Sequence, residues 1–288
     1  MKVSVVISAC GGRETLFERS LHTYTKQTLP KDEFEILLID DGNRIELLEL
    51  CRKYHDAHNL SFQYVRIDPS KSNYPSKSFT PALTNNVGFR IASGNVVVIT
   101  GPETLQAENN LLIASSMTSR KECAYGLVFR ASQVFENYIS SDNRWRMMDF
   151  SFLLSLPGAK AECRTCPPHP PAYCYCVAVN RDYITQIRGI DERFLEGICA
   201  EDDDFANRMK FLGVIPVFDH KMIGIHQNHE SRDRQDETHN ARFTSKWAEL
   251  RSHNIRLMRE NLVAKDPVVN KGHEWGDLRT IISKEILC

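Results

Sequence analysis

Four consecutive acidic residues, Glu201 to Asp204, are the side chains of this sequence whose types and spacing most clearly suggest chemistry. Phe205, Met209 and Leu212 follow at the spacing of one helix face, so the acids fall on the first turn of a helix. Free backbone N–H groups and the helix dipole stabilise negative charge there, and any one acid could serve only as a cap. Four together repel one another, which raises the pKa of the least solvated carboxylate and can produce a general base.

A second group of acids, Asp40 and Asp41, follows the apolar segment 35–39, which reads as a buried strand. Segment 3–8 is an earlier strand of the same kind, and an amphipathic helix over 14–24 separates the two. This order, with acids at the carboxyl end of a strand, predicts the opening of a doubly wound α/β sheet, where ligands bind at strand ends. Each aspartate alone could equally bond to its own turn.

Helical and apolar segments continue to alternate through the next hundred residues. Helices are expected over 45–54, 82–92 and 109–117, and strands over 62–67, 96–100 and 124–131. Residues 68–81 contain three prolines and read as a loop, and a loop of this length inside a domain is usually functional or mobile. The pattern predicts an α/β fold with a Rossmann-like, doubly wound mixed sheet.

Composition restricts the class of protein. The chain has 288 residues, 42% of them hydrophobic, and a net charge of −1, which gives no general reason to expect nucleic acid or an anionic membrane as partner. The segment after Met1 is too short and too β-branched for a signal peptide, and no run is long enough to span a bilayer. Nine scattered cysteines fit reduced thiols. We therefore expect a soluble, cytoplasmic protein that could still bind peripherally to a membrane.

Several of these pieces recur together in one known family. The stretches FEILLIDDGN, PALTNNVGFRIASGNVVVITGPE, GIDERFLEGICAEDDDFANRMKFLG and HQNH follow one another along the chain. In this order they make the sequence resemble a glycosyltransferase of family 2 type with the GT-A fold. The resemblance covers residues 1–230 and implies a catalytic domain there. Residues 231–288 are charged and then helical, and we expect a C-terminal helical extension that packs on the domain or mediates self-association, as in a homo-oligomer.

The resemblance implies a binding site for a nucleotide-sugar donor, most simply a UDP-sugar. In the family, the end of the first strand and the Asp-Asp-Gly turn hold the base and ribose, and carboxylates can accept from such hydroxyls and N–H groups. The strand near residue 100 should then end in an Asp-x-Asp that carries the metal. Here its first acid is replaced by Gly101. The nucleotide-sugar-binding residues implied are Ser8, Ala9, Asp40, Asp41, Asn85, Gly101 and Glu103.

Glu103, the acid that remains, can still be an oxygen ligand for Mn²⁺ or Mg²⁺. Related enzymes with a His-Gln-x-His segment place its first histidine on the metal, so the resemblance assigns that role to His226. A histidine after an apolar strand can equally be a packed residue. His229 is a weaker candidate, for the metal or for the acceptor.

The acid block resembles the Gly-Gly-Glu-Asp-x-Asp block of inverting members of the family, such as galactosyltransferases and chondroitin-polymerase-type enzymes. Residue by residue, this assigns the catalytic base to Asp202 and an orienting role to Glu201. Asp203 would contact the acceptor or the helix. Ala200 replaces the second glycine of the family pattern. Asp202 would take the proton of the acceptor hydroxyl as it attacks the anomeric carbon in a single displacement, which inverts that carbon.

Two further features could carry binding. The cysteines Cys163, Cys166, Cys174 and Cys176 lie close enough in sequence for a thiolate Zn²⁺ site, although their spacing is shorter than in common zinc ribbons and buried thiols are an alternative. Trp145, between two arginines, could stack on an acceptor sugar, whereas its apolar neighbours read first as core.

The sequence therefore predicts an inverting, metal-dependent glycosyltransferase that moves a sugar from a nucleotide-sugar to a hydroxyl of a glycan or glycoconjugate. Because the Asp-x-Asp lacks its first acid, a non-catalytic relative that only binds a sugar nucleotide is the alternative. A nucleotidyltransferase is disfavoured, since Gly11-Gly12-Arg13 is too short for a phosphate-binding loop. The donor sugar and the acceptor are left open.

Overall fold

Ten strands form one mixed sheet in the computed structural model, which describes residues 1–9, 13–42, 45–74, 81–141, 143–165, 175–229 and 245–288. The first half is parallel and contains β1 (Val3–Ala9), β2 (Phe34–Asp40), β3 (Phe62–Ile67) and β4 (Val96–Thr100). β1 lies between β2 and β4, so the order of strands reverses at the β1/β4 pair. The carboxyl ends of these strands share one edge, and the reversal is where α/β sheets bind ligands.

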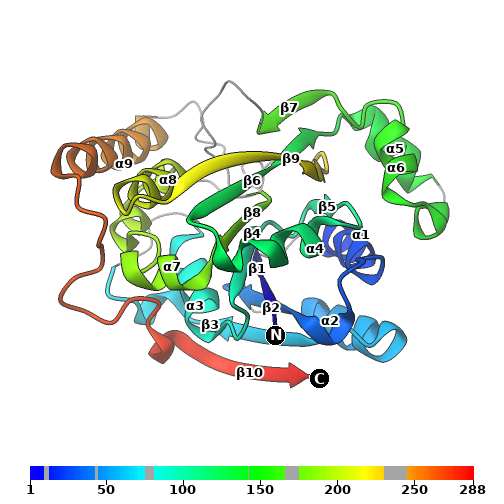
Figure 1. Cartoon of the computed structure of the whole chain (residues 1–288), viewed down its shortest axis with the longest axis horizontal. Helices are drawn as coiled ribbons and strands as arrows, with labels where there is room; N and C mark the ends of the chain where they lie inside the picture. Colours follow the sequence, from blue (N-terminus) through cyan, green and yellow to red (C-terminus); the bar gives the residue numbers. More distant parts are fainter. Residues whose placement is uncertain (10–12, 43–44, 75–80, 142, 166–174, 230–244) are drawn as a thin grey trace.

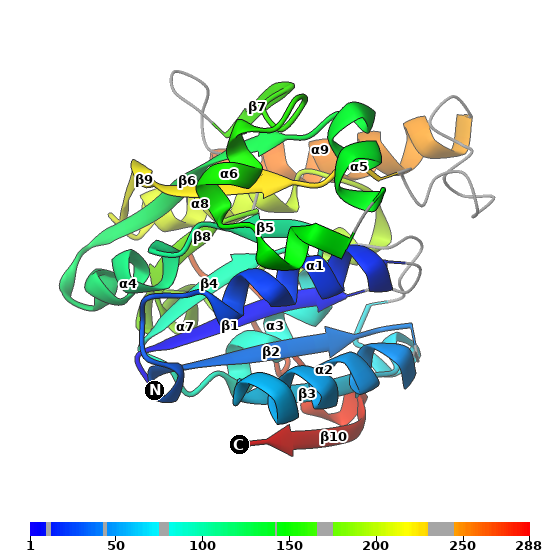
Figure 2. The ribbon, with the colours of Figure 1, turned by 90° about the vertical axis from the view of Figure 1, so that its right-hand side faces the viewer.

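The second half of the sheet is mixed. β4 pairs antiparallel with β8 (Val177–Asn180), β8 with β6 (Glu122–Arg130), and β6 parallel with the long β9 (Ile215–His226). β5 (Thr104–Gln106) closes this side on β9, and the short β7 (Glu162–Thr165) pairs with β6. The sheet order is β10-β3-β2-β1-β4-β8-β6-β9-β5, and Figures 1 and 2 show it from two directions. The predicted fold class is confirmed.

Helices cover both faces of the sheet (Figure 2). One face packs against α1 (Glu14–Thr25), α2 (Ile45–His58) and α4 (Asn110–Ser115). The other packs against α3 (Ala82–Ile91), α7 (Arg181–Ile187) and α8 (Glu201–Phe211). α5 (Gln133–Ser140), the 3-10 helix η4 (Asn143–Met147) and α6 (Phe150–Ser155) enclose a smaller cluster beside β5.

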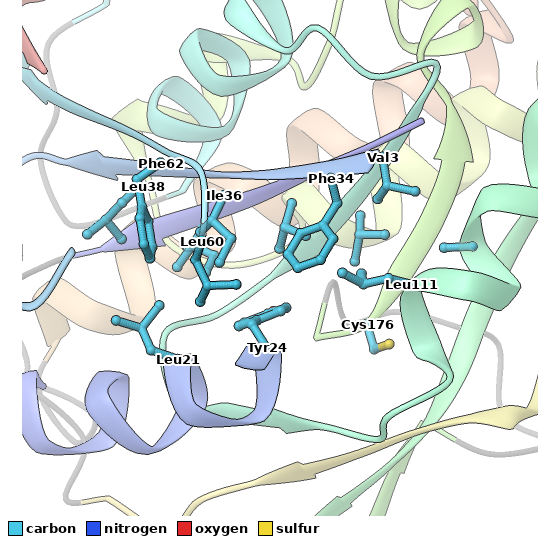
Figure 3. Close-up of a cluster of buried hydrophobic side chains, with 14 of the residues drawn as sticks. Val3, Leu21, Tyr24, Phe34, Ile36, Leu38, Leu60, Phe62, Leu111 and Cys176 are labelled. Carbon is cyan, nitrogen blue, oxygen red and sulfur yellow. The ribbon is translucent and has the colours of Figure 1, made fainter. Parts of the chain in front are cut away.

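Alternation along the strands explains these layers. Successive side chains of a strand point to opposite faces, so a strand buried on both faces is apolar throughout. In β2, Ile36 and Leu38 join the cluster under α1, while Leu37 and Ile39 join the cluster under α3. Figure 3 shows Tyr24 of α1, which is fully buried, pointing toward this first set.

The carboxy-terminal segment contains a strand as well as the expected helix. α9 (Ser245–Ala264) packs on α8, as the helical prediction requires. β10 (Ile281–Leu287) then pairs antiparallel with β3 and becomes an edge of the main sheet. The prediction of a purely helical extension is therefore incomplete, because residues 281–287 form a strand in which Ile281 and Leu287 are half-buried.

Candidate active site

A pocket of about 110 Å³ opens at the carboxyl ends of β1 and β4. It collects side chains from widely separated segments, among them Ser8 from β1, Asn85 from α3, Glu103 from the turn after β4, and Asp202 from α8. Gly101 also lines it. The structure thus brings together five of the residues predicted from the sequence, and the strand reversal explains why they meet.

Glu103 is a buried carboxylate held between Arg13 and His226. Its side chain is 7% exposed; Arg13 Nη1 donates to Oε2 over 2.9 Å, and His226 Nε2 lies 3.3 Å from Oε1. Burial alone would raise the pKa of Glu103, but the Arg13 guanidinium and the imidazoles of His226 and His229 outweigh it and hold that pKa well below its ordinary value. Glu103 is therefore ionised at neutral pH.

His226 and His229 join Glu103 in the one group of potential metal ligands found among the residues with described positions. One ligand atom from each lies within 4.8 Å of the others. His226 is the last residue of β9 and is 5% exposed, its ring lies edge-on to Tyr175, and its Nδ1 has no hydrogen-bond partner within the described chain. The other ring nitrogen, Nε2, faces the carboxylate of Glu103 and is the atom that could share a cation with it.

The glycine that replaces the first acid of the Asp-x-Asp has a steric reason. A Cβ on Gly101 would lie 2.8 Å from Glu103 Oε1 and 3.0 Å from its carboxyl carbon. The carboxylate of Glu103 therefore folds back over residue 101, and an acid there would displace it. The absence of a side chain at residue 101 therefore leaves the space that the carboxylate of Glu103 occupies.

Gln227 fixes the two ligand-bearing segments to each other. It is fully buried, and both its backbone N–H and its side-chain amide donate to the carbonyl oxygen of Glu103. The amide also donates to Leu16 of α1, and Arg19 donates to its Oε1. Arg19 is itself paired with buried Glu136 over 2.7 Å. Through these bonds Gln227 holds the backbone that carries His226 close to the backbone of Glu103.

The four acids at the start of α8 separate into different roles. Asp202 is half-buried and faces the pocket. Glu201 is buried, its Oε2 has no partner among the described groups, and burial together with the charge of Asp202 raises its pKa to about 8. Asp203 is half-buried but does not line the pocket. Asp204 is buried in a structural ion pair with Arg208.

The backbone that presents these acids is strained. Cys199 and Ala200 both have positive φ, 66° and 74°, a region that side chains with a Cβ rarely adopt. Ala200 occupies the place of the second glycine of the family pattern, and its φ is one that glycine adopts without cost. Ala200 thus adopts a left-handed conformation that a glycine would favour.

Asp40, in contrast, lies outside the pocket. Its carboxylate is fully buried and accepts from Tyr64 and from the backbone N–H of Gly42, both over 2.7 Å. Asp40 therefore bonds to its own turn, as the alternative interpretation of the sequence expects, and also to Tyr64. Ala9 is buried at the end of β1, where its carbonyl accepts from the N–H of Asp41, which is half-buried. None of the three is among the residues that line the pocket.

Trp145 belongs to the small cluster under α5 and α6. Only 7% of it is exposed, it packs edge-on against His22, and the Arg146 guanidinium lies 4.5 Å from the centre of its ring. It does not line the pocket that contains Asp202. The core interpretation given to its neighbours therefore extends to Trp145 itself.

The proposed zinc site falls partly outside the described residues, which exclude Cys166 and Cys174. Cys163 is disulfide-bonded, so the expectation of reduced thiols is wrong at this position. Cys176 is a buried thiol beside Gln106, and burial raises its pKa to about 12. A disulfide sulfur is not a thiolate ligand, so Cys163 does not fit the predicted zinc site.

Three contributors to the site escape sequence reasoning. Arg13 follows two glycines in a segment too short for a phosphate-binding loop, Gln227 is the second residue of the histidine segment, and Tyr175 lies between Cys174 and Cys176. Gln227 lies in a short polar segment, and its burial follows only from the tertiary fold. Arg13 and Tyr175 likewise carry no signal in the sequence, because only the tertiary fold brings them to Glu103 and His226.

No family model matches the chain. Its sequence is similar to the poly(ribitol-phosphate) beta-N-acetylglucosaminyltransferase TarS of Staphylococcus aureus strain Mu50, with 29% identity over 98 residues, which are 34% of this chain and 15% of that protein. The TarS of strain MW2 matches to the same extent. The matched region thus spans about one seventh of these relatives.

Solved structures resemble a much larger part of the chain. TarS residues 1–349 of S. aureus in complex with UDP-GlcNAc match 92% of this chain and 69% of that one, with a TM-score of 0.57 and 17% identity. The mannosyltransferase PcManGT of Pyrobaculum calidifontis, in complex with GDP-Man and Mn²⁺, matches 91% and 64%, with a TM-score of 0.54 and 17% identity. GalNAc-T7 with UDP, GalNAc and Mn²⁺ matches 80% and 44%, also with a TM-score of 0.54 and 17% identity.

At these identities the likeness is one of fold. The doubly wound sheet, the pocket at its strand reversal and these neighbours agree on one architecture. The chain has the GT-A fold of nucleotide-sugar glycosyltransferases.

Proposed function

We propose that the chain is a glycosyltransferase that moves a sugar from a UDP-sugar to a hydroxyl group of a glycan or glycoconjugate, with inversion at the anomeric carbon. The observation that carries this proposal is the pocket shared by Ser8, Asn85, Glu103 and Asp202. It offers groups for a nucleotide-sugar, a carboxylate for a cation and a carboxylate for a base in one place. Uridine is favoured because TarS and GalNAc-T7 were solved with UDP or UDP-GlcNAc.

Donor binding would use the sides of the pocket at β1 and α3. Asn85 is 3% exposed, and its Oδ1 has no hydrogen-bond partner in the described parts of the chain. A buried amide oxygen without a partner costs about 1–3 kcal/mol, so a ligand N–H or hydroxyl is its natural complement. Ser8 lies at the end of β1, where its hydroxyl bonds to that of Thr84 and lines the pocket as a second polar group.

A divalent cation fits the group of Glu103, His226 and His229. In octahedral coordination at about 2.1 Å, adjacent ligand atoms lie about 3 Å apart, close to the 3.3 Å between Glu103 Oε1 and His226 Nε2. Two imidazoles with one carboxylate are softer than the all-oxygen sets typical of Mg²⁺, so we favour Mn²⁺. Such an ion would neutralise charge on the departing diphosphate.

Asp202 is proposed as the base. It would accept the proton of the acceptor hydroxyl while that oxygen bonds to the anomeric carbon and the bond from that carbon to the phosphate oxygen breaks, releasing UDP. Glu201 is less suited, because a carboxyl with a pKa near 8 is protonated at pH 7. As a neutral acid it can donate a hydrogen bond that orients the acceptor or Asp202.

The reaction can be tested by measuring UDP release against a panel of UDP-sugars with Mn²⁺. Wild-type protein should turn over at least one donor with an acceptor, EDTA should abolish turnover, and Asp202→Asn should lower kcat by about 10²- to 10⁴-fold. NMR of the product would report the anomeric configuration. Equal turnover by Asp202→Asn would remove Asp202 as base.

A non-catalytic, sugar-nucleotide-binding relative is the second candidate, and Gly101 is the observation in its favour. It predicts that UDP-sugars raise the melting temperature of the protein while neither transfer nor hydrolysis occurs with any member of the panel.

Residues 1–230 are proposed as the catalytic domain. α9 and β10 would complete it, and self-association stays a prediction. No helix in the described residues is long and apolar enough to cross a bilayer.

A further inference from the structure

We propose that Arg13 binds the diphosphate of the donor and provides part of its affinity independently of the cation. This inference rests on the proposed function, because it names a further ligand-binding residue of the same pocket. It assigns to Arg13 a role beyond its ion pair with Glu103. The geometry places the guanidinium where a nucleotide diphosphate would lie between the end of β1 and the candidate metal ligands.

The position of Arg13 is the first step. It lies directly before α1 and lines the pocket together with Ser8, Glu103 and Asp202. Its side chain is 18% exposed, so it is largely enclosed but still reachable. A residue placed between the proposed nucleotide-binding end of β1 and the cation ligands faces the part of the donor that joins the nucleoside to the sugar.

Charge is the second step. Among the described residues that line the pocket, Glu103 and Asp202 are acids and Arg13 is the cation. The protein groups therefore sum to about −1, and a divalent cation brings the pocket to about +1, which suits an anionic diphosphate. Without Arg13 the same pocket would reach only about zero with the ion bound. Replacement of the first Asp-x-Asp acid by Gly101 acts in the same direction, since it removes one negative charge.

Geometry of the guanidinium is the third step. It has five N–H donors in a planar fork, and the bond to Glu103 Oε2 uses Nη1. A planar fork of this kind contacts two oxygens of a phosphate at once, which a lysine ammonium does not do. The bond to Glu103 also keeps the guanidinium in a fixed orientation, which lowers the entropy lost when a phosphate binds.

Calorimetric titration of UDP and UMP in EDTA tests the proposal, because these nucleotides differ only by one phosphate. Wild-type protein should bind UDP at least about tenfold more tightly than UMP, as expected for a charge-assisted hydrogen bond. Arg13→Gln should weaken UDP about tenfold and leave UMP unchanged. Arg13→Lys should retain part of the preference, and Arg120→Gln, an exposed arginine remote from the pocket lining, should change neither.

A purely structural Arg13 gives a different result. If the residue only anchors Glu103, Arg13→Gln should change Mn²⁺ affinity in the absence of nucleotide, measured by EPR, and should affect UDP and UMP equally in EDTA. Equal loss for both nucleotides, or no loss for UDP, would overturn the inference while leaving the proposed function intact. Failure of wild-type protein to bind UDP even with Mn²⁺ would overturn both.

Discussion

Glu103 remains ionised in a buried position because neighbouring side chains stabilise its negative charge in place of water. Arg13 and His226 each bond to one of its oxygens, and Gly101 leaves the space into which the carboxylate folds. The role of Glu103 was predictable, since it is the acid that remains after an apolar strand. The need for glycine at 101 was not, because it follows from a contact inside a turn whose shape depends on the tertiary fold.

Substituting Gly101 tests this contact. Gly101→Ala places a Cβ against the carboxylate, so Mn²⁺ affinity should fall about tenfold, the lower end of losses for displaced ligand orientation. Gly101→Asp should bind no more tightly, although it restores the acid of the common family pattern. Mn²⁺ titration followed by EPR measures both, with melting temperature as the control for folding. A tighter Gly101→Asp would show that the carboxylate of Glu103 can move aside.

Glu201 provides a prediction about pH. Its pKa in the folded protein is raised by burial and by Asp202 to about 8, above the ordinary value of 4.5. A raised carboxyl pKa stabilises the fold fully below the unfolded pKa, and this contribution is lost as pH rises through the folded pKa. Glu201→Gln should therefore gain stability relative to wild type between about pH 5 and pH 8, by up to about 1.4 kcal/mol per pH unit.

Urea denaturation at several pH values measures this difference. Asp203→Asn is a suitable comparison, because Asp203 lies on the same turn of α8 and burial also raises its pKa, but it is only half-buried and its variant should gain less stability as pH rises. A difference between Glu201→Gln and wild type that does not change with pH would mean that Glu201 is ionised in the folded protein.

At the scale of elements, the site depends on how β9, α1 and the turn after β4 meet. Gln227 follows the last residue of β9 and bonds to Leu16 of α1 and to the backbone of Glu103. The strands and helices themselves were predictable from periodicity, and so was the helical start of the acid block. Gln227 was missed because a lone glutamine in a short polar segment has the same pattern whether it is buried or exposed.

Gln227→Ala should lower both stability and metal affinity. Loss of the side-chain amide leaves buried partners unsatisfied, which costs about 1–3 kcal/mol in the free energy of unfolding. The neighbouring variant Asn228→Ala removes an exposed contact to Gln133 and should change stability by less than about 0.5 kcal/mol. Denaturant titration with Mn²⁺ binding measures both variants. Unchanged Mn²⁺ affinity in Gln227→Ala would show that the segment positions His226 without it.

At the scale of the molecule, β10 makes the carboxy-terminal segment part of the sheet. Charged, weakly amphipathic sequence after residue 230 suggested a helical extension, and α9 agrees. The strand was missed because its outward residues include Ile282 and Ile286, so the polar alternation that marks an exposed edge is blurred. The partner of β10 is β3, which lies far from it in the sequence. The local pattern of residues 281–287 cannot identify such a distant partner.

Removing β10 should expose the edge of β3. A chain that ends after Thr280 should melt about 5 °C or more below the full chain, since a free edge strand loses its ladder of hydrogen bonds and apolar contacts. It should also aggregate as its concentration rises, which light scattering detects. Ile286→Lys, a change at a side chain that is 56% exposed, keeps the strand and should leave the melting temperature nearly unchanged. Equal melting of truncated and full chains would make β10 dispensable.

The order of strands also has a consequence for synthesis on the ribosome. β1 to β4 leave the ribosome first and can pair as a parallel unit, but the outer neighbour of β4 is β8 and that of β3 is β10. Both borders of the nascent four-stranded unit thus stay open until much later codons are translated. We expect this period to be when the newborn polypeptide most needs chaperones, because unpaired borders recruit other chains.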